Sequence, residues 1–301
     1  MAMNVSGKTA IITGAGSGIN LCFATQLLSK GCNVIFADLT LRPEAEAIVS
    51  KYPLTSSSAK AVFQKTDVTD WAQLDRLFEV AIEHFGGADI VCPGAGVYEP
   101  PTSNFWHPPG SPPSRDDPQS SRYALLDINL THPIRLTQLA ISHFLALKRP
   151  GSIPHITSVA GQAPFFPTPV YVATKHALTG FVRSLSRLEN PPPDTGLPKI
   201  RVTAVAPARI LTPLWTDNPD KLKMVGAEPG WVTPEEVARV MVDLVEGEKN
   251  VGGTILEIGR CVRRVECYND PGPMEGGNGV GNDEGYEGDM WKALKRQFDG
   301  K

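Results

Sequence analysis

The sequence predicts an α/β fold: a single doubly wound domain, with a parallel sheet of about seven strands and helices on both of its faces. Short apolar runs of strand length alternate with longer amphipathic segments up to about residue 260. Such alternation is typical of consecutive β-α-β units. The chain of 301 residues, 41% hydrophobic and 20% charged, has the ordinary balance of a globular protein with a large core.

The elements follow from their periodicity and their ends. Continuous apolar runs between glycines or polar residues suit strands that are buried on both faces. Helices are expected where apolar residues recur every three or four positions. The predicted strands are 8–13, 33–37, 61–64, 88–92, 152–157, 200–206 and 253–258. The predicted helices are 18–30, 71–85, 122–148, 170–188 and one that begins at the cap Thr233-Pro234-Glu235-Glu236.

Two irregular stretches lie inside this domain, which we expect to span residues 1–262. The insert 98–121 is rich in Pro and Ser and carries Phe105 and Trp106 at its centre. It leaves the end of a strand, so it either forms an apolar lid over a bulky substrate or lies exposed. The Pro-rich stretch 191–198 is expected to be a surface loop.

The segment 263–301 is expected to be a tail. Gly and acidic residues dominate it, and that composition predicts disorder over about 270–289 because little apolar surface can be buried. A short amphipathic helix is expected over 291–298, where Trp291, Leu294 and Phe298 share one face. This helix either docks on the domain itself or on another subunit, or frays.

Charge and cysteine content exclude several classes of protein. A net charge of −3 gives no basic excess that would favour nucleic acid or an anionic membrane surface. No run reaches the roughly 18 apolar residues of a membrane span. The five cysteines are scattered, without disulfide-framework or metal-ligand spacing, so we expect no metal and a reducing compartment. The N-terminal residues lack signal-peptide features, and a cytoplasmic location is expected.

The turn after the first strand indicates a nucleotide site. Thr13-Gly-Ala-Gly-Ser-Gly-Ile19 joins a predicted strand to a predicted helix. Its glycines allow a pyrophosphate to approach the backbone, and the free N–H groups of the helix attract it. Asp38 ends the second strand, where a carboxylate can accept hydrogen bonds from ribose hydroxyls and would repel a 2′-phosphate. This Rossmann-type arrangement favours NAD over NADP, although Arg42 lies nearby; Asp38 as a loop carboxylate or helix cap is the alternative.

Tyr171-Val-Ala-Thr-Lys175, with Ser158 before it, resembles the active-site signature of the short-chain dehydrogenase/reductase family. The glycine-rich turn, Asp67-Val68, Asn129-Leu130 and 207–212 match that family in order and spacing over about residues 5–260. Within the family, 169–176 and the acidic stretch before Val251-Gly-Gly resemble the NAD-linked 15-hydroxyprostaglandin dehydrogenase branch, and the long Pro-rich insert resembles fungal secondary-metabolite dehydrogenases.

The chemistry explains why these residue types occur together. Removal of a hydride from an alcohol carbon requires a base for the hydroxyl proton, and a free tyrosine has a pKa near ~10. Tyr171 and Lys175 lie one helical turn apart, so we expect the ammonium and the nicotinamide charge to lower the pKa of the phenol. Ser158 at a strand end can donate to the substrate oxygen. Read singly, Tyr171 and Lys175 can be a surface pair, Ser158 a loop cap, and Asn129 a backbone partner.

The resemblance assigns the remaining roles. It implies that Asn129 belongs to a water-mediated proton path and that Lys175 also binds the nicotinamide ribose. It places Asp67 at the adenine ring, with a helix cap as the competing use, and Thr212 at the carboxamide or phosphates. The expected catalytic residues are Asn129, Ser158, Tyr171 and Lys175. The expected cofactor-binding residues are Gly14, Gly16, Ser17, Gly18, Ile19, Asp38, Asp67, Val68, Gly94, Ala95, Gly96, Tyr171, Lys175, Ile210 and Thr212.

Four positions depart from the family pattern. Asn20 stands at the third glycine of the turn, Pro93-Gly94 replaces the usual pair of asparagines, and Ala208 replaces a glycine. The side-chain hydrogen bonds of those asparagines are lost, so the loop after the fourth strand must be held differently. These departures bear on cofactor affinity and leave every catalytic group in place.

The expected protein is thus an NAD(H)-dependent oxidoreductase of a secondary alcohol or ketone, with a bulky apolar small-molecule substrate. A homodimer or homotetramer is implied by the resemblance, with the helices 122–148 and 170–188 as candidates for the contact. A non-redox cyclase-like enzyme and a nucleotide-sensing binding protein on the same scaffold are the alternatives.

Overall fold

The computed structural model describes residues 2–217, 230–266 and 284–299. Within these ranges one sheet has the strand order β3-β2-β1-β4-β5-β6-β7-β8. All neighbouring strands are parallel except β8, which runs antiparallel to β7. The strands are β1 (Thr9–Thr13), β2 (Asn33–Asp38), β3 (Ala61–Lys65), β4 (Ile90–Cys92), β5 (Gly151–Ile156), β6 (Ile200–Pro207), β7 (Ile255–Ile258) and β8 (Val262–Arg264).

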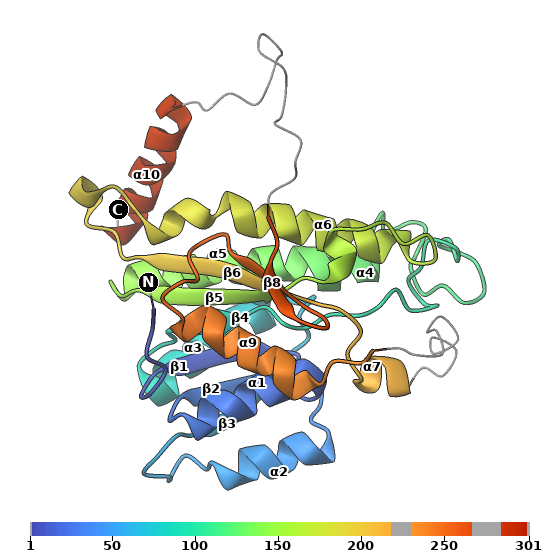
Figure 1. Ribbon diagram of the computed structural model, residues 1–301, viewed down its shortest axis with the longest axis horizontal. Coiled ribbons are helices and arrows are strands. Elements are labelled where there is room, and N and C mark those ends of the chain that lie inside the picture. Colours follow the sequence, from blue (N-terminus) through green and yellow to red (C-terminus); the bar gives the residue numbers. More distant parts are fainter. Residues whose placement is uncertain (1, 218–229, 267–283, 300–301) are drawn as a thin grey trace.

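The helices cover both faces of this sheet (Figure 1). They are α1 (Gly18–Ser29), α2 (Pro43–Lys51), α3 (Trp71–Phe85), α4 (Ala124–Leu126), α5 (His132–Ala146), α6 (Pro169–Ser184), α7 (Pro213–Thr216), α9 (Pro234–Glu246) and α10 (Glu284–Phe298). A π-helical turn, η1 (Asp127–Thr131), joins α4 to α5. Three short 3-10 turns complete the described chain: η2 (Val159–Gly161), η3 (Ser186–Glu189) and η4 (Pro193–Thr195).

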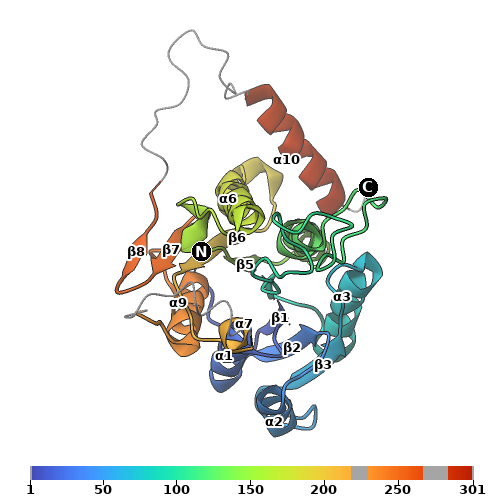
Figure 2. The same cartoon turned by 90° about the vertical axis from the view of Figure 1, so that its right-hand side faces the viewer.

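Two apolar clusters hold the layers together. Helices α1 and α9 pack on one face of the sheet, and α3, α5 and α6 on the other (Figure 2). The strands β1 and β6 are buried along their whole length, as expected for strands covered on both faces. The doubly wound fold predicted from the alternation is therefore confirmed.

The chain order places a crevice at the centre of the sheet. Strand β1 pairs with β2 on one side and with β4 on the other, and the two halves of the sheet are built outward from this point. In open α/β sheets ligands bind at such a switch point, outside the carboxyl ends of the strands. The loops that follow β1 to β6 are therefore the ones that can form a site.

The structure also contains elements that the periodicity did not predict. These include α2, α7, and β8, which continues the sheet to Arg264 beyond the expected boundary at Val262. The expected helix 122–148 is divided into α4, η1 and α5. Of the predicted disorder over 270–289, residues 270–283 lie outside the described ranges, whereas 284–289 already belong to α10.

Helix α10 lies against α5 (Figure 2). The Gln297 side chain donates a hydrogen bond to Ser142 at 2.6 Å, and the ammonium of Lys148 lies 5.2 Å from the centre of the Phe298 ring. The expected tail helix thus docks on the surface of its own chain. No helix within the described ranges is both long and apolar enough to cross a bilayer.

Candidate active site

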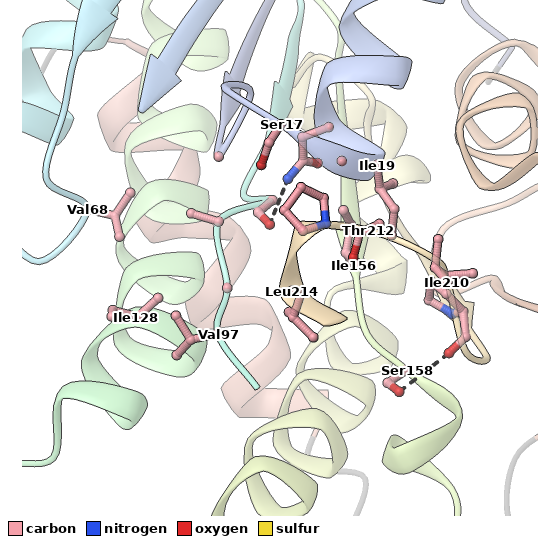
Figure 3. Close-up of a pocket in the computed structure, with 18 of the residues that line it drawn as sticks. Ser17, Ile19, Val68, Val97, Ile128, Ile156, Ser158, Ile210, Thr212 and Leu214 are labelled. Carbon is pink, nitrogen blue, oxygen red and sulfur yellow. Dashed lines mark hydrogen bonds between the residues drawn. The ribbon is translucent and has the colours of Figure 1, made fainter. Parts of the chain in front are cut away.

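A cavity of about 380 Å³ opens at the carboxyl ends of β1 to β6 (Figure 3). Ser17 and Ile19 line one side of it and Ser158 another, with Thr212 and Leu214 between them. The expected site residues in its wall are Gly14, Ser17, Gly18, Ile19, Asp38, Asp67, Val68, Gly94, Ala95, Gly96, Ser158, Tyr171, Lys175, Ile210 and Thr212. Gly16 and Asn129 are not part of the wall, and each contacts residues that are.

The glycine-rich turn packs tightly against Asp38. The N–H of Gly16 donates to Asp38 Oδ2 at 2.8 Å, and the N–H of Leu39 donates to Asp38 Oδ1 at 2.7 Å. A Cβ at position 16 would lie 2.4 Å from the Thr40 carbonyl oxygen, so only glycine fits. Asp38 therefore ties the turn to the end of β2 and presents its carboxylate at the cavity, where a ribose would be bound.

The loop after β4 is held by Thr13 and Asn20. The Thr13 hydroxyl accepts hydrogen bonds from the N–H groups of Gly94 at 2.9 Å and Ala95 at 3.2 Å. The Asn20 amide donates to the Gly94 carbonyl at 2.9 Å, and Asn20 is 7% exposed. These hydrogen bonds hold the loop after β4 in place of those that the missing asparagine pair would make. The amide of Asn20 is directed to this loop rather than into solvent.

Asp67 and Asn129 both bond to neighbouring chain segments. Asp67 Oδ1 accepts from the N–H of Thr69 at 2.9 Å and from its hydroxyl at 2.7 Å, while Asp67 also lines the cavity. Asn129, 1% exposed, bonds both ways with Val97: its Oδ1 accepts from the Val97 N–H at 2.9 Å, and its Nδ2 donates to the Val97 carbonyl at 2.8 Å. Its side chain thus fixes the cavity wall from behind.

Tyr171 and Lys175 point from the first turns of α6 toward the end of β5. The Lys175 ammonium donates to the Ile156 carbonyl at 2.9 Å and lies 5.5 Å from the centre of the Tyr171 ring. Ser158 follows β5 and hydrogen-bonds the phenol of Tyr171, and its hydroxyl also donates to the Pro207 carbonyl at 3.4 Å. Phenol, hydroxyl and ammonium therefore meet at one side of the cavity.

The electrostatics of this group differ from the expectation. Burial raises the pKa of Tyr171 to about 12, against the opposing effect of the Ser158 hydrogen bond. Burial also lowers the pKa of Lys175 to about 8. Desolvation disfavours the charged form of both groups, and its effect on the phenol is larger than any lowering by the ammonium. The protein groups by themselves thus hold Tyr171 in its neutral form.

Several residues of the cavity wall were not among the expected ones. These are Asn20, Leu39, Thr66, Val97, Ile128, Ile156, Thr157, Pro207, Ala208, Pro213 and Leu214. Most of them directly follow a strand or a named site residue. Position at a strand end is a signal that would have found them, whereas Ile128 comes from η1 and gave no such signal.

Trp106 is the centre of an exposed aromatic cluster. The Trp106 ring lies 4.9 Å from that of Phe105 and 4.9 Å from that of Phe166. All three side chains are exposed. Tyr98, at the start of the same insert, packs edge-on against Tyr171 with the ring centres 4.8 Å apart. The insert 98–121 thus reaches from the phenol to an exposed apolar surface.

The residues present fit a dinucleotide. The tight turn leaves no room for side chains at positions 14 and 16, where a Cβ would lie 2.8 and 2.4 Å from backbone atoms. The turn leads into the N-terminus of α1, whose N–H groups attract phosphate. A carboxylate stands at the end of β2, and a phenol, a hydroxyl and an ammonium lie at the other end of the cavity. This donor set suits proton transfer at an alcohol or carbonyl oxygen.

Comparison with known proteins gives consistent results. The family model described as short chain dehydrogenase matches residues 8–223. The chain is 28% identical over 274 residues to the NAD(+) 15-hydroxyprostaglandin dehydrogenase of Rattus norvegicus, covering 85% of this chain and 92% of that one. A hydroxynaphthalene reductase-like protein of Metarhizium guizhouense is 30% identical over 71% of this chain and 73% of its own. A mutant short-chain dehydrogenase/reductase of Serratia marcescens superposes with a TM-score of 0.66 at 27% identity, covering 85% and 98%.

Proposed function

Since this chain belongs to the short-chain dehydrogenase family and is an oxidoreductase, we propose that it transfers a hydride between NAD(H) and a bulky, apolar secondary alcohol or its ketone. The observation that carries the proposal is the meeting of Tyr171, Ser158 and Lys175 at one side of the cavity. The relatives are named dehydrogenase and reductase, which favours redox chemistry over the cyclase-like and nucleotide-sensing alternatives.

The proposed roles follow from where each polar atom lies. The bound nicotinamide supplies the chemistry of accepting or returning the hydride. The Ser158 hydroxyl donates to the substrate oxygen and holds it beside the Tyr171 phenol, which takes up or gives the proton. The Lys175 ammonium favours the phenolate and donates to the cofactor ribose. Asn129 keeps the wall at Val97 in place, and its place in a water-mediated proton path stays a prediction from the resemblance.

The proposed cofactor-binding residues extend along the cavity from Asp38 to Thr212. Asp38 accepts from the ribose hydroxyls, and its charge disfavours a 2′-phosphate. The guanidinium of Arg42, the cation that the sequence placed nearby, forms an ion pair with Asp217. Its charge is already engaged, which supports NAD over NADP. A relative named for NAD(+) supports the same choice.

The bulky substrate is inferred from the insert 98–121. Its Phe105 and Trp106 form, with Phe166, an exposed apolar surface, and its first residue, Tyr98, packs against the Tyr171 ring. Exposed aromatic clusters of this kind mark binding surfaces. We assign the insert as a lid over an apolar substrate such as a lipid or polyketide.

The cellular location and the oligomeric state of the protein are inferred from its thiols and its helices. We propose a cytoplasmic enzyme, with the unpaired thiols of Cys22, Cys32, Cys92 and Cys261 as support. A homodimer or homotetramer stays a prediction. Helix α10 lies on α5. A subunit contact through α5 would therefore have to include α10 or use the part of α5 that α10 does not cover.

The experiment is a panel of small and bulky secondary alcohols and ketones, tested with NAD(H) and with NADP(H). Turnover is followed by the absorbance of the reduced nicotinamide. We expect turnover with NAD and apolar secondary alcohols. Tight NAD binding in calorimetry with no turnover on any alcohol or ketone would contradict the proposed function.

A further inference from the structure

The structure assigns a positioning role in catalysis to Glu99, a buried residue of the insert 98–121: we infer that Glu99 fixes the place of the Tyr171 phenol. This inference rests on the proposed function, because it concerns the group that moves the proton. Glu99 was not among the residues expected from the sequence, and it does not line the cavity. It acts through Tyr171 and contacts no reacting atom.

Each carboxylate oxygen of Glu99 accepts a hydrogen bond from a backbone N–H group. Its Oε2 accepts the N–H of Tyr171 at 2.8 Å, and its Oε1 accepts the N–H of Phe105 at 3.1 Å. The residue is only 3% exposed. A carboxylate out of water is costly unless its oxygens are hydrogen-bonded. The two bonds therefore hold the insert and the start of α6 to one buried group.

Helix α6 depends on an outside partner for its first turn. The first N–H groups of a helix have no acceptor within the helix. The N-cap residue Thr168 makes no side-chain capping bond, and the first turn of α6 contains no acidic residue. Tyr171 is the third residue of α6, so Glu99 supplies from another segment the acceptor that an N-cap normally supplies. The negative charge also suits the positive end of the helix.

Tyr98, the residue before Glu99, also contacts Tyr171. Tyr98 packs edge-on against the Tyr171 ring at a centre distance of 4.8 Å. Glu99 has a φ of 29°, in the left-handed region that residues other than glycine rarely adopt. Such a conformation persists only where surrounding contacts hold it. One dipeptide of the insert thus sets both the backbone and the ring of the proton-carrying residue.

Asp116 offers a matched control in the same insert. It is 7% exposed, and its Oδ2 accepts from the Ser103 hydroxyl at 2.7 Å. Its Oδ1 accepts from the N–H of Ala124 at 2.9 Å. Asp116 therefore anchors the insert through a buried carboxylate, as Glu99 does, but its side chain bonds to Ser103 and Ala124 and not to Tyr171.

The experiment compares Glu99→Ala, Glu99→Gln and Asp116→Asn in the full chain. The expected loss in Glu99→Ala is about tenfold or more in kcat, because misplacement of a catalytic group lowers the rate steeply. The KM for NAD should stay within about twofold. Glu99→Gln keeps one acceptor oxygen and should recover part of kcat, and Asp116→Asn should lower kcat clearly less than Glu99→Gln does. Hydrogen exchange should be faster at the Tyr171 amide in Glu99→Ala alone.

Two results would overturn the inference: equal kcat losses in Glu99→Ala and Asp116→Asn, or an unchanged kcat in Glu99→Ala. If Glu99→Ala does not fold, an unchanged kcat and unchanged Tyr171 amide exchange in Glu99→Gln would do the same. A wild-type protein without any turnover would instead contradict the proposed function, and hydrogen exchange would still report whether the contact exists.

Discussion

The Asn20 side chain fills the space that a side chain at position 94 would need. A Cβ built on Gly94 would lie 2.3 Å from Asn20 Oδ1, and the Asn20 amide donates to the Gly94 carbonyl at 2.9 Å. The two departures from the family pattern at these positions are thus one structural feature. An amide that is missing from the loop is supplied from α1, and the loop has lost the side chain that would collide with it.

This relationship predicts strong coupling between the two positions. Gly94→Asn alone should lower the free energy of unfolding by about 2 kcal/mol through overpacking. Asn20→Gly alone should cost about 1 kcal/mol or more, because a hydrogen bond is lost and glycine enters a helix. The double variant should be more stable than the sum predicts. Urea denaturation of the four proteins measures this, and additive effects would show that the positions are independent.

Cofactor choice should depend on the pairing of Arg42 with Asp217. Asp217→Asn removes the negatively charged partner of the Arg42 guanidinium. Arg42 itself lies next to the glycine-rich turn, because its backbone N–H donates to the Gly16 carbonyl. The ratio of kcat/KM for NADP to that for NAD should rise about tenfold, which corresponds to roughly 1.4 kcal/mol. Arg42→Gln added to Asp217→Asn should abolish the gain. An unchanged ratio in Asp217→Asn would exclude Asp217 as a determinant of cofactor choice.

The pH dependence should reflect Lys175 and Tyr171 as a pair. The pKa of Lys175 is lowered to about 8 and that of Tyr171 is raised to about 12. Alcohol oxidation requires that the pair has lost one proton, and this first loss is shared by both groups. The value of kcat/KM for NAD, which reports the free enzyme, should therefore rise with pH through about 8. In Lys175→Met the residual activity should rise only at higher pH. An identical profile would contradict the coupling.

The lid assignment predicts a loss that depends on substrate size. Trp106 contacts Phe105 and Phe166 in the exposed cluster. Trp106→Ala should raise the KM for bulky apolar alcohols about two- to tenfold, since an aromatic contact contributes about 0.5–1.5 kcal/mol. The KM for a small secondary alcohol serves as the internal control and should stay unchanged. A similar rise for both alcohols would dismiss a lid over the substrate.

The sheet and most of the cavity wall could be predicted from the sequence because they depend on short-range patterns. Apolar runs such as Lys8 to Thr13 and the glycine-rich turn specify strand and turn locally, and the alternation of elements then brings the strand ends together. The expected strand Asn33 to Ala37 differs from the observed one by a single residue. Residues at the ends of those strands therefore line the cavity, and their roles in binding and catalysis stay predictions.

Contacts between distant segments could not be predicted in the same way. Glu99 meets Tyr171 across 72 positions and Asn20 meets Gly94 across 74, and no local pattern in an irregular insert indicates such partners. The strand β8 is a three-residue edge strand without apolar alternation. The raised pKa of Tyr171 depends on its burial, which the spacing of Tyr171 and Lys175 does not reveal.

The most direct test of the proposed enzyme is Tyr171→Phe, which removes the phenol and keeps the ring. Tyr52→Phe, at the end of α2 and away from the cavity wall, is the matched control. We expect Tyr171→Phe to lose nearly all turnover of the secondary alcohol while NAD binds with a Kd within about threefold of wild type, because only the proton carrier is gone. Turnover in Tyr171→Phe equal to that in Tyr52→Phe would contradict the role of the phenol and, with it, the proposed mechanism.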